Sequence, residues 1–396
     1  MARADKHSKQ TTGGSQTKLT VLGTTLVGLA AAALIAASAP AQPTTTTRAQ
    51  AAGLQKDVDA LVTAGTPGAI LIARDGARTV RLASGLADVA RKRPMHPGDR
   101  FRIASLTKSY VAAVGLQLVA EGKLSLDESV ERRLPGVVPN GRKIRIRQLL
   151  NHTSGLFDFA ADPRVLKPYL KGDFGFHWAP RTLVQIGVSH KPLFRPGARY
   201  GYSNTDYLVL GLIAEAVTGN SLASELRSRI FRPLGLRATA FPTSPLIANP
   251  YAHGYYVFAK PPATDVSAVS PFPWAAGAMV ATGADILSFY RALLAGRILE
   301  PKLLNAMKTT VPEGRKTDIP GSRYGLGLER FPTSCGTAWG HNGAIAGYLV
   351  FAFTSTDGSR QAVLMVNEDG SSLTKRAGEL FFKVIDKAFC SVGKRA

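Results

Sequence analysis

The sequence lacks the signatures of several common catalytic and binding classes. It contains no Gly-x-Ser-x-Gly, so the nucleophile elbow of the α/β-hydrolases is absent. It also contains no Gly-x-x-x-x-Gly-Lys loop, which would cradle a phosphate. The seven histidines form no His-x-x-x-His pair and the two cysteines form no Cys-x-x-Cys pair, so no zinc motif is present. We therefore expect neither a metal nor another cofactor.

Acidic residues are scarce relative to basic ones. The chain has 27 Asp and Glu against 49 Lys and Arg, which gives a formal net charge of +22. Such a balance suits a negatively charged partner, for example nucleic acid, an anionic membrane or a polyanionic cell wall. No basic helix with interleaved aromatic residues is evident, so we expect no nucleic-acid partner. Apolar residues make up 45% of the chain, which is enough for a globular core.

Long apolar runs are also scarce, and the longest lies near the N-terminus. Basic residues precede an apolar run over residues 19–37, which ends in Ala39-Pro40-Ala41, a small-x-small cleavage pattern. We expect residues 1–41 to be a signal peptide and the mature protein to be secreted, with no stable membrane span after cleavage. The alternative is an uncleaved segment that anchors the protein to the outer face of the membrane, because the run is near spanning length.

The two cysteines, Cys335 and Cys390, both lie near the C-terminus. In an exported protein they would close one long-loop disulfide. The alternative is a pair of buried thiols.

The strand patterns lie at both ends of the chain and the helix patterns lie between them. Residues 42–50, rich in Pro, Thr and Gln, predict a flexible tether, and residues 51–391 predict one domain. Strands are expected in a hairpin at 68–86 around Asp75-Gly76, and in four segments between 324 and 366. The predicted fold is α/β (α+β): an antiparallel sheet from 51–125 and 274–391, flanked by helices, with a mainly helical insertion at 126–273.

Within the insertion the patterns are uneven. We expect helices at Leu126–Leu134, Asn204–Val217 and Leu222–Phe231, and irregular chain over 160–180. Residues 241–273 carry seven prolines and no clear period, which predicts a long surface loop.

A serine and a lysine three residues apart, Ser105 and Lys108, open the helix pattern that runs to Val119. Residues at i and i+3 share a helix face, and the helix N-terminus adds a partial positive charge beside the serine. A buried lysine loses preference for its charged form and can accept the serine proton. The alternative is an N-cap serine with a solvated lysine. The Ser-x-x-Lys pattern alone is weak, because three other serines also begin it: Ser15, Ser372 and Ser391.

Two further motifs follow in the chain. Tyr202 and Asn204 form its single Tyr-x-Asn at the start of a second apolar helix, where a tyrosine hydroxyl could shuttle a proton and an amide could hold substrate. The alternative is a turn with Asn204 as N-cap. His341 and Gly343 form a His-x-Gly in the C-terminal strands, where small residues would leave room for a substrate backbone to pair. Each motif alone is equally compatible with a structural role.

The order of these three motifs resembles that of the penicillin-recognising serine hydrolases. The class C β-lactamase-like group is most similar, in particular its exocellular serine-type D-alanyl-D-alanine carboxypeptidases. The likeness covers roughly residues 50–391 and implies the same sheet with a helical insertion. Other similar stretches are Phe101-Arg102, residues 116–124, residues 146–156, Tyr324–Leu328 and the Cys335 and Cys390 pair.

The resemblance also implies a role for each motif residue. Ser105 would form an acyl-enzyme, Lys108 and Tyr202 would handle its proton, and Tyr202 would protonate the leaving group. His341 would supply positive charge and a hydrogen bond. The backbone N–H groups of Ser105 and Ala344 would form the oxyanion hole. The implied substrate-binding residues are Asn204, Trp274, Asn342, Gly343 and Ala344.

Three positions depart from the carboxypeptidase pattern. Glu329 stands where these enzymes place an arginine, and Asn342 and Ala344 stand where they place hydroxyls. A pocket that gains an acid and loses hydroxyls is a poor site for a substrate carboxylate.

The resemblance implies a penicillin-sensitive, monomeric D-alanyl-D-alanine carboxypeptidase that acts on peptidoglycan peptides and is acylated by β-lactams. The alternative within the family is an esterase or a β-lactamase-like amidase that acts on a small ester or amide. A different class, a non-catalytic module that binds wall polymers through its positive charge, predicts salt-sensitive binding that does not need Ser105.

Overall fold

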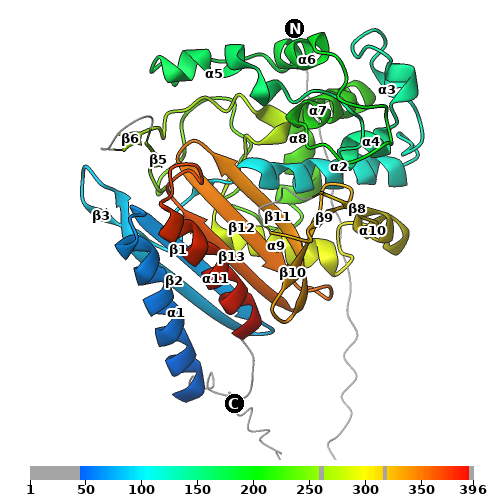
Figure 1. Ribbon diagram of the computed structural model, residues 1–396. Helices are drawn as coiled ribbons and strands as arrows, with labels where there is room; N and C mark the ends of the chain where they lie inside the picture. The colour runs from blue at the N-terminus through cyan, green and yellow to red at the C-terminus, as the bar shows by residue number, and fades with distance from the viewer. Residues whose placement is uncertain (1–44, 258–262, 315–318, 392–396) are drawn as a thin grey trace, which may run out of the picture. The chain divides into compact units, whose positions relative to one another are not determined.

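A nine-stranded antiparallel sheet forms the centre of the protein (Figure 1). This computed structural model describes residues 45–257, 263–314 and 319–391. The strand order is β3-β2-β1-β13-β12-β11-β10-β9-β8, so the N-terminal hairpin joins the C-terminal strands through the β1–β13 pair. This confirms the predicted fold class. The bounds are β1 Gly68–Asp75, β2 Arg78–Asp88, β3 Arg93–Pro94, β8 Val311–Pro312, β9 Arg323–Tyr324, β10 Glu329–Thr333, β11 Gly336–Ile345, β12 Tyr348–Thr354 and β13 Arg360–Val366.

Helices cover both faces of the sheet. The terminal helices α1 (Thr45–Thr63) and α11 (Lys375–Ser391) pack side by side on one face (Figure 1). On the other face lie α2 (Thr107–Ala120) and α9 (Gly283–Leu294), which share a core with the helical insertion. Alternate residues of β1 supply the two cores: Leu71 faces the terminal helices, whereas Ile70 and Ile72 face the insertion. Because both faces are buried, the strand is apolar throughout rather than alternating.

The insertion packs onto the sheet as part of the same folded unit, residues 44–396. Gly219 takes a left-handed conformation and ends its long central helix α7, as the sequence predicts. The insertion contains α3 Val130–Arg133, α4 Ile146–Leu150, α5 Pro163–Leu170, α6 Pro180–Ser189, α7 Asn204–Thr218 and α8 Leu222–Leu226, with a π-helical turn at Arg227–Phe231. The remaining elements are β4 Phe101–Arg102, β5 Tyr255–Tyr256, β6 Thr264–Asp265, β7 Val280–Ala281, α10 Pro301–Lys308 and the 3₁₀ turns at Ala104–Leu106, Gly141–Lys143, Phe159–Ala161 and Trp274–Ala276.

Two predictions at the chain's N-terminal end have different outcomes. The tether prediction is wrong from Thr45 onward, because α1 begins there. The chain from residue 48 to 52 reads Arg-Ala-Gln-Ala-Ala, which are good helix formers with no proline among them. The expected signal peptide, residues 1–41, lies outside the described residues.

Several predictions for the insertion and the strand region are also wrong. Residues 160–180 contain α5, which Asp162 caps by accepting a hydrogen bond from the backbone N–H of Arg164. The helix expected at 126–134 is shorter and forms only α3. The first of the four strands expected between 324 and 366 is also shorter and forms only β9.

The 241–273 segment is a loop, as predicted, but several of its described residues are buried. Val266 and Phe272 are among them. One nitrogen of the buried Arg102 guanidinium donates to the carbonyls of Pro245 and Ser267, so this segment supplies hydrogen-bond acceptors to a charge inside the protein.

The predicted disulfide is present between Cys335 and Cys390, with an S–S distance of 2.02 Å. It joins the β10–β11 turn to the end of α11. The alternative of two buried thiols is therefore excluded.

In the described part of the chain, no single helix is long and apolar enough to cross a membrane, although one bent pair, Asn204–Thr218 with Leu222–Phe231 at 83°, meets the test of length and composition.

Candidate active site

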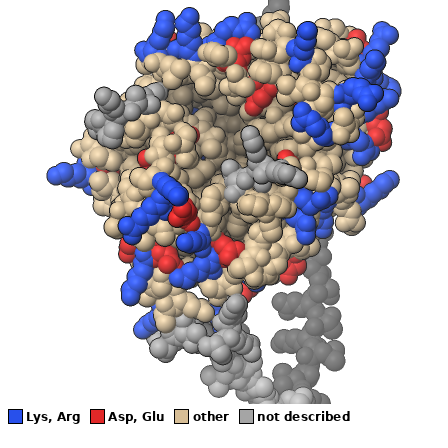
Figure 2. Space-filling model, viewed as in Figure 1, with Lys and Arg blue, Asp and Glu red and all other residues tan. Residues whose placement is uncertain are grey.

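A cavity of about 590 Å³ lies between the sheet and the helical insertion, and Ser105 is one of the residues that line it. Ser105 lies in the 3₁₀ turn before α2, rather than in the helix itself. The preceding residue, Ala104, has a φ of +46°, an unusual conformation for a residue with a side chain and one that often marks functional sites. Lys and Arg side chains lie mostly around the margin of the face shown in Figure 2, and its middle carries few charged groups.

The structure brings Ser105, Lys108 and Tyr202 together. The Tyr202 hydroxyl lies 2.7 Å from Ser105 Oγ, and Lys108 Nζ lies 2.9 Å from the same oxygen. Lys108 Nζ also lies 2.8 Å from Asn204 Oδ1 and 2.7 Å from the Ala276 carbonyl. A neutral amine has two N–H groups and one lone pair. If the N–H groups donate to Asn204 and Ala276, the lone pair faces the serine hydroxyl and can accept its proton.

Burial lowers the pKa of Lys108 to about 7, although carboxylates nearby, that of Asp158 first, oppose this effect. Removing an ammonium from water favours its neutral form. A lysine with this pKa is half deprotonated at neutral pH, so it can serve as a general base without a histidine.

The rate of serine acylation should therefore depend on pH through Lys108. Protonated Lys108 cannot accept the serine proton, so kcat/KM should be low at pH 5 and rise about tenfold per pH unit until it levels off above about 7. A pH–rate profile with a p-nitrophenyl ester measures this. A profile that stays flat from about pH 5 to 9 would show that Lys108 is not the base.

Tyr202 keeps its proton, because burial raises the pKa of its hydroxyl well above the usual value. Its ring centroid lies 4.8 Å from Lys108 Nζ, so the cation, when present, is in contact with the aromatic face. A protonated phenol next to Ser105 Oγ is placed to donate to a leaving group.

Asn204 acts mainly on Lys108. Its side-chain amide donates to Asp158 Oδ2 at 3.0 Å, which turns the amide oxygen toward Lys108. Asn204 also lines the cavity, which is the position that the predicted contact with substrate requires. Sequence reasoning missed Asp158, which belongs to no motif and lies 46 residues away from Asn204 in the chain.

The structure places the His341 side chain inside the protein, whereas the resemblance implies that it meets the substrate. Its side chain is fully buried and is not among the described residues that line the cavity. Burial lowers the pKa of His341 to about 3, which favours the neutral ring. Its Nε2 lies 2.8 Å from the Tyr324 hydroxyl and its Nδ1 lies 3.2 Å from Glu329 Oε1. The histidine thus orders Tyr324 and Glu329 on the face of the sheet that carries the insertion, where its strand partner Ala352 also lies.

The other residues of that motif do line the cavity: Asn342, Gly343 and Ala344. The reason for the glycine differs from the expected one. A Cβ at Gly343 would lie 2.4 Å from the Ile103 carbonyl oxygen and 3.0 Å from the Ser105 backbone nitrogen. Gly343 therefore lets β11 approach the turn that carries the nucleophile.

Trp274 is not part of the cavity wall, contrary to expectation. It is absent from the described lining residues, and its ring lies against Gly211 of α7. The aromatic wall comes instead from residues that no motif marks: Phe159, Tyr169, Phe174 and Phe272.

The charged residues in the described lining of the cavity are all acidic. Glu313, Glu329 and Asp369 line it, and no lysine or arginine is among the described residues that do so. Glu329, which the sequence marks as a departure, is almost fully buried, at 4% exposed. Glu313 and Glu329 both lie near Tyr200, and after burial they are the largest causes that raise the pKa of its hydroxyl.

Curated proteins resemble this chain in sequence over about half of its length or more. The D-aminopeptidase of Brucella anthropi is 27% identical over 328 residues, which is 82% of this chain and 59% of that protein. A putative D-alanyl-D-alanine carboxypeptidase of Escherichia coli K12 is 34% identical over 202 residues, 47% of this chain and 44% of that protein. The chain thus spans about three fifths or less of the length of these relatives.

Solved structures and a family model agree with this likeness. A D-stereospecific amidohydrolase from Streptomyces sp. is 38% identical with a TM-score of 0.77, over 86% of this chain and 98% of that one. The D-amino acid amidase of Ochrobactrum anthropi SV3, in complex with L-phenylalanine amide, is 30% identical with a TM-score of 0.76, over 86% and 97%. A model described as Beta-lactamase matches residues 54–381, so the chain belongs to this family of serine hydrolases.

Proposed function

We propose that this protein hydrolyses amide bonds of D-amino acid amides or short peptides that carry a free amino group, through an acyl-enzyme on Ser105. The observation that carries the proposal is the presence of three acidic side chains, Glu313, Glu329 and Asp369, in the described lining of the cavity next to Ser105. A substrate ammonium forms charge-assisted hydrogen bonds with such carboxylates. The solved relatives named as D-stereospecific and D-amino acid amidases support the same substrate class.

The carboxypeptidase function takes second place. Its substrate ends in a carboxylate, which would lie beside Glu313 and Glu329 with no lysine or arginine among the described lining residues. Like charges at short distance repel strongly in a partly buried site. The carboxypeptidase reading keeps the support of the Escherichia coli relative, and it shares the same acylation chemistry, including acylation by β-lactams.

We also propose that the protein is exported and acts as a monomer outside the cytoplasm. The small-x-small site at 39–41 supports export, and the Cys335–Cys390 disulfide suits an oxidising compartment.

A comparison of three substrates tests the proposed function. D-phenylalanine amide, its N-acetyl derivative and a peptide ending in D-Ala-D-Ala differ in which charged end they present. We expect a kcat/KM for the free-amine amide that exceeds the value for the acetylated amide by about 10- to 100-fold, the range of a charge-assisted hydrogen bond. A clear preference for the D-Ala-D-Ala peptide would contradict the proposal and favour the carboxypeptidase.

Glu329→Gln should weaken recognition of the ammonium specifically. The change removes the negative charge while keeping the side-chain size, so kcat/KM for D-phenylalanine amide should fall about 10-fold or more, whereas that for the acetylated amide should change less than about threefold. Glu379→Gln is the matched control, because Glu379 is exposed on α11, which packs on the sheet face opposite the insertion. Equal losses for both substrates would assign Glu329 to structure rather than to specificity.

A further inference from the structure

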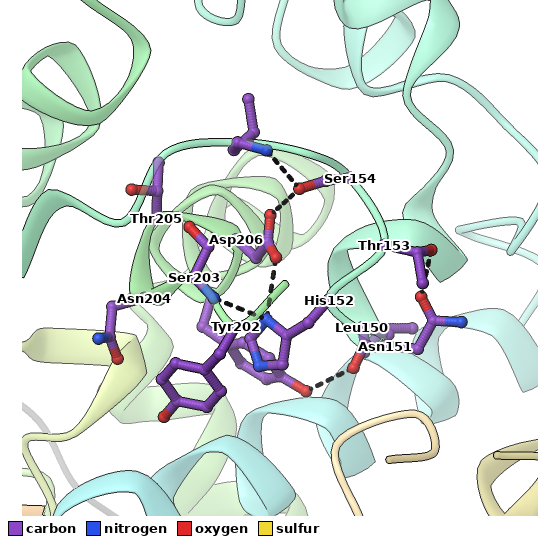
Figure 3. Close-up of polar contacts among 12 residues, drawn as sticks. Leu150, Asn151, His152, Thr153, Ser154, Tyr202, Ser203, Asn204, Thr205 and Asp206 are labelled. Atoms are coloured by element: carbon purple, nitrogen blue, oxygen red, sulfur yellow. Dashed lines mark hydrogen bonds and ion pairs between the residues drawn. The ribbon is translucent and has the colours of Figure 1, made fainter. Parts of the chain in front are cut away.

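A buried polar cluster lies directly behind Tyr202 (Figure 3). His152 and Asp206 are both fully buried, and neither lines the cavity among the described residues. His152 Nδ1 lies 2.9 Å from Asp206 Oδ2, and Ser154 Oγ donates to Asp206 Oδ1 at 2.5 Å. Asp206 lies in the first turn of α7, two residues after Asn204. One helix start therefore carries both the amide that holds Lys108 and the carboxyl group that holds His152.

His152 contacts the chain on both sides of Tyr202. The Gly201 backbone N–H donates to the His152 carbonyl at 2.8 Å, and the Ser203 backbone N–H donates to His152 Nδ1 at 3.3 Å. The His152 and Tyr202 rings lie 4.5 Å apart between centroids. His152 has a φ of +56°, a left-handed backbone that only a few per cent of residues other than glycine adopt. Such a conformation persists where surrounding contacts hold it, as these two hydrogen bonds do.

The hydrogen-bond pattern also indicates where the protons lie. The Ser203 N–H points at His152 Nδ1 at 3.3 Å, which makes this nitrogen an acceptor and puts the ring proton on Nε2, a buried atom with no hydrogen-bond partner among the described residues. The Asp206 oxygen that lies 2.9 Å from Nδ1 must then be the donor. Asp206 is thus a neutral carboxylic acid that gives one hydrogen bond to the histidine and accepts one from Ser154. The electrostatics agree, because burial raises the pKa of Asp206 and lowers that of His152, each well away from its ordinary value.

We propose that His152 and a protonated Asp206 form an uncharged pair that positions Tyr202 for proton transfer to and from Ser105. The pair acts through the backbone on either side of Tyr202 and through contact of the two rings, and touches neither substrate nor Ser105.

The neutral state of the pair matters for the lysine as well. An ionised Asp206 would raise the pKa of Lys108 and keep it protonated, because opposite charges attract strongly in a buried site. A protonated His152 would add a second cation beside Lys108. An uncharged pair can orient Tyr202 without either effect. The ionisable groups that surround the pair are Lys108 on α2, Asp158, Tyr200, Tyr202, Tyr207 on α7, Tyr324 on β9 and His341 on β11.

The first test compares two replacements of Asp206. Asp206→Asn retains a neutral donor to His152 and an acceptor for Ser154, whereas Asp206→Ala retains neither. We expect the rate of Ser105 acylation by a p-nitrophenyl ester to fall only about threefold in Asp206→Asn and about 100-fold in Asp206→Ala, with KM little changed in either. The midpoint of the pH–rate profile should be the same in Asp206→Asn and the wild type. A downward shift of about one pH unit or more would overturn the proposal, because it would show that Asp206 is charged.

The second test asks whether His152 acts through Tyr202. His152→Ala should lower the acylation rate about 100-fold in the wild type but little in a Tyr202→Phe background, since residues of one unit have non-additive effects. Rates are measured well below the melting temperature of each variant. Additive losses would overturn the proposal and assign His152 a general structural role; if His152→Ala does not fold, the Asp206 pair of variants decides alone. The inference rests on acylation of Ser105, and the ester reports it even if D-amino acid amides prove not to be substrates.

Discussion

Ser105→Ala will abolish acylation, with an expected loss of at least about 10⁴-fold in kcat/KM. Lys108 and Tyr202 both contact Ser105 Oγ, so the change removes the atom to which the whole site is directed. The fold should be unaffected, because a small polar group at the cavity wall is replaced by a smaller one. The loss is measured with an ester substrate and by labelling with a fluorescent penicillin, which should mark the wild type alone.

The chain provides a matched control for this experiment. Ser372 begins a second Ser-Leu-Thr-Lys tetrapeptide, identical in sequence to the one at Ser105. Its hydroxyl accepts a hydrogen bond from the Val257 backbone, and it is not among the described residues that line the cavity. Ser372→Ala should therefore retain full activity. Equal labelling of Ser105→Ala and the wild type would refute the acyl-enzyme assignment and favour the wall-binding module.

Lys108→Met is expected to have the second largest effect, a fall in kcat of about 10²- to 10⁴-fold, the usual range for loss of a general base. Methionine fills a similar volume but has no group that accepts a proton. Because Lys108 is fully buried, an amine from the protein surface cannot reach its position. Lys108→Arg should be equally inactive, since a guanidinium does not deprotonate in proteins.

The stability of these lysine variants separates chemistry from folding. Burying a charge is costly, so replacing Lys108 with an apolar residue offsets part of the loss of its contacts to Asn204 and Ala276. We expect a melting temperature within about 5 °C of the wild type, which corresponds to roughly 1–2 kcal/mol. Lys375→Met, in the matching tetrapeptide, is the control. Lys108→Met with more than about a tenth of wild-type kcat would show that another group takes the serine proton.

The catalytic trio could be predicted because its signals are local or ordered along the chain. Ser105 and Lys108 are three residues apart, and any helical turn brings such residues together. Tyr202 comes from a distinctive Tyr-x-Asn at a helix start. The sequence also predicts the importance of Glu329, an acid where the carboxypeptidases place an arginine, and this residue lines the cavity.

The roles of His341 and Trp274 could not be predicted, because a motif does not show which way a side chain points. His341 and Gly343 lie on the same face of β11, yet Gly343 lines the cavity whereas the His341 side chain is fully buried and contacts Tyr324. Asp158 was missed for a different reason. Its partner Asn204 is 46 residues away, and an isolated aspartate carries no signal of such a contact.

The sequence by itself determined the fold class and the disulfide, and its motifs, together with the family resemblance, predicted Ser105, Lys108 and Tyr202 as nucleophile, base and proton donor. These follow from periodicity, from cysteine number and from short motifs, which are local properties of the chain. Only the tertiary structure decided that His341 is buried, that the described cavity lining carries three acidic residues, and that His152 and Asp206 lie next to Tyr202. The physical reason is that burial and charge at a site are sums over residues distant in sequence, and folding alone brings those residues together.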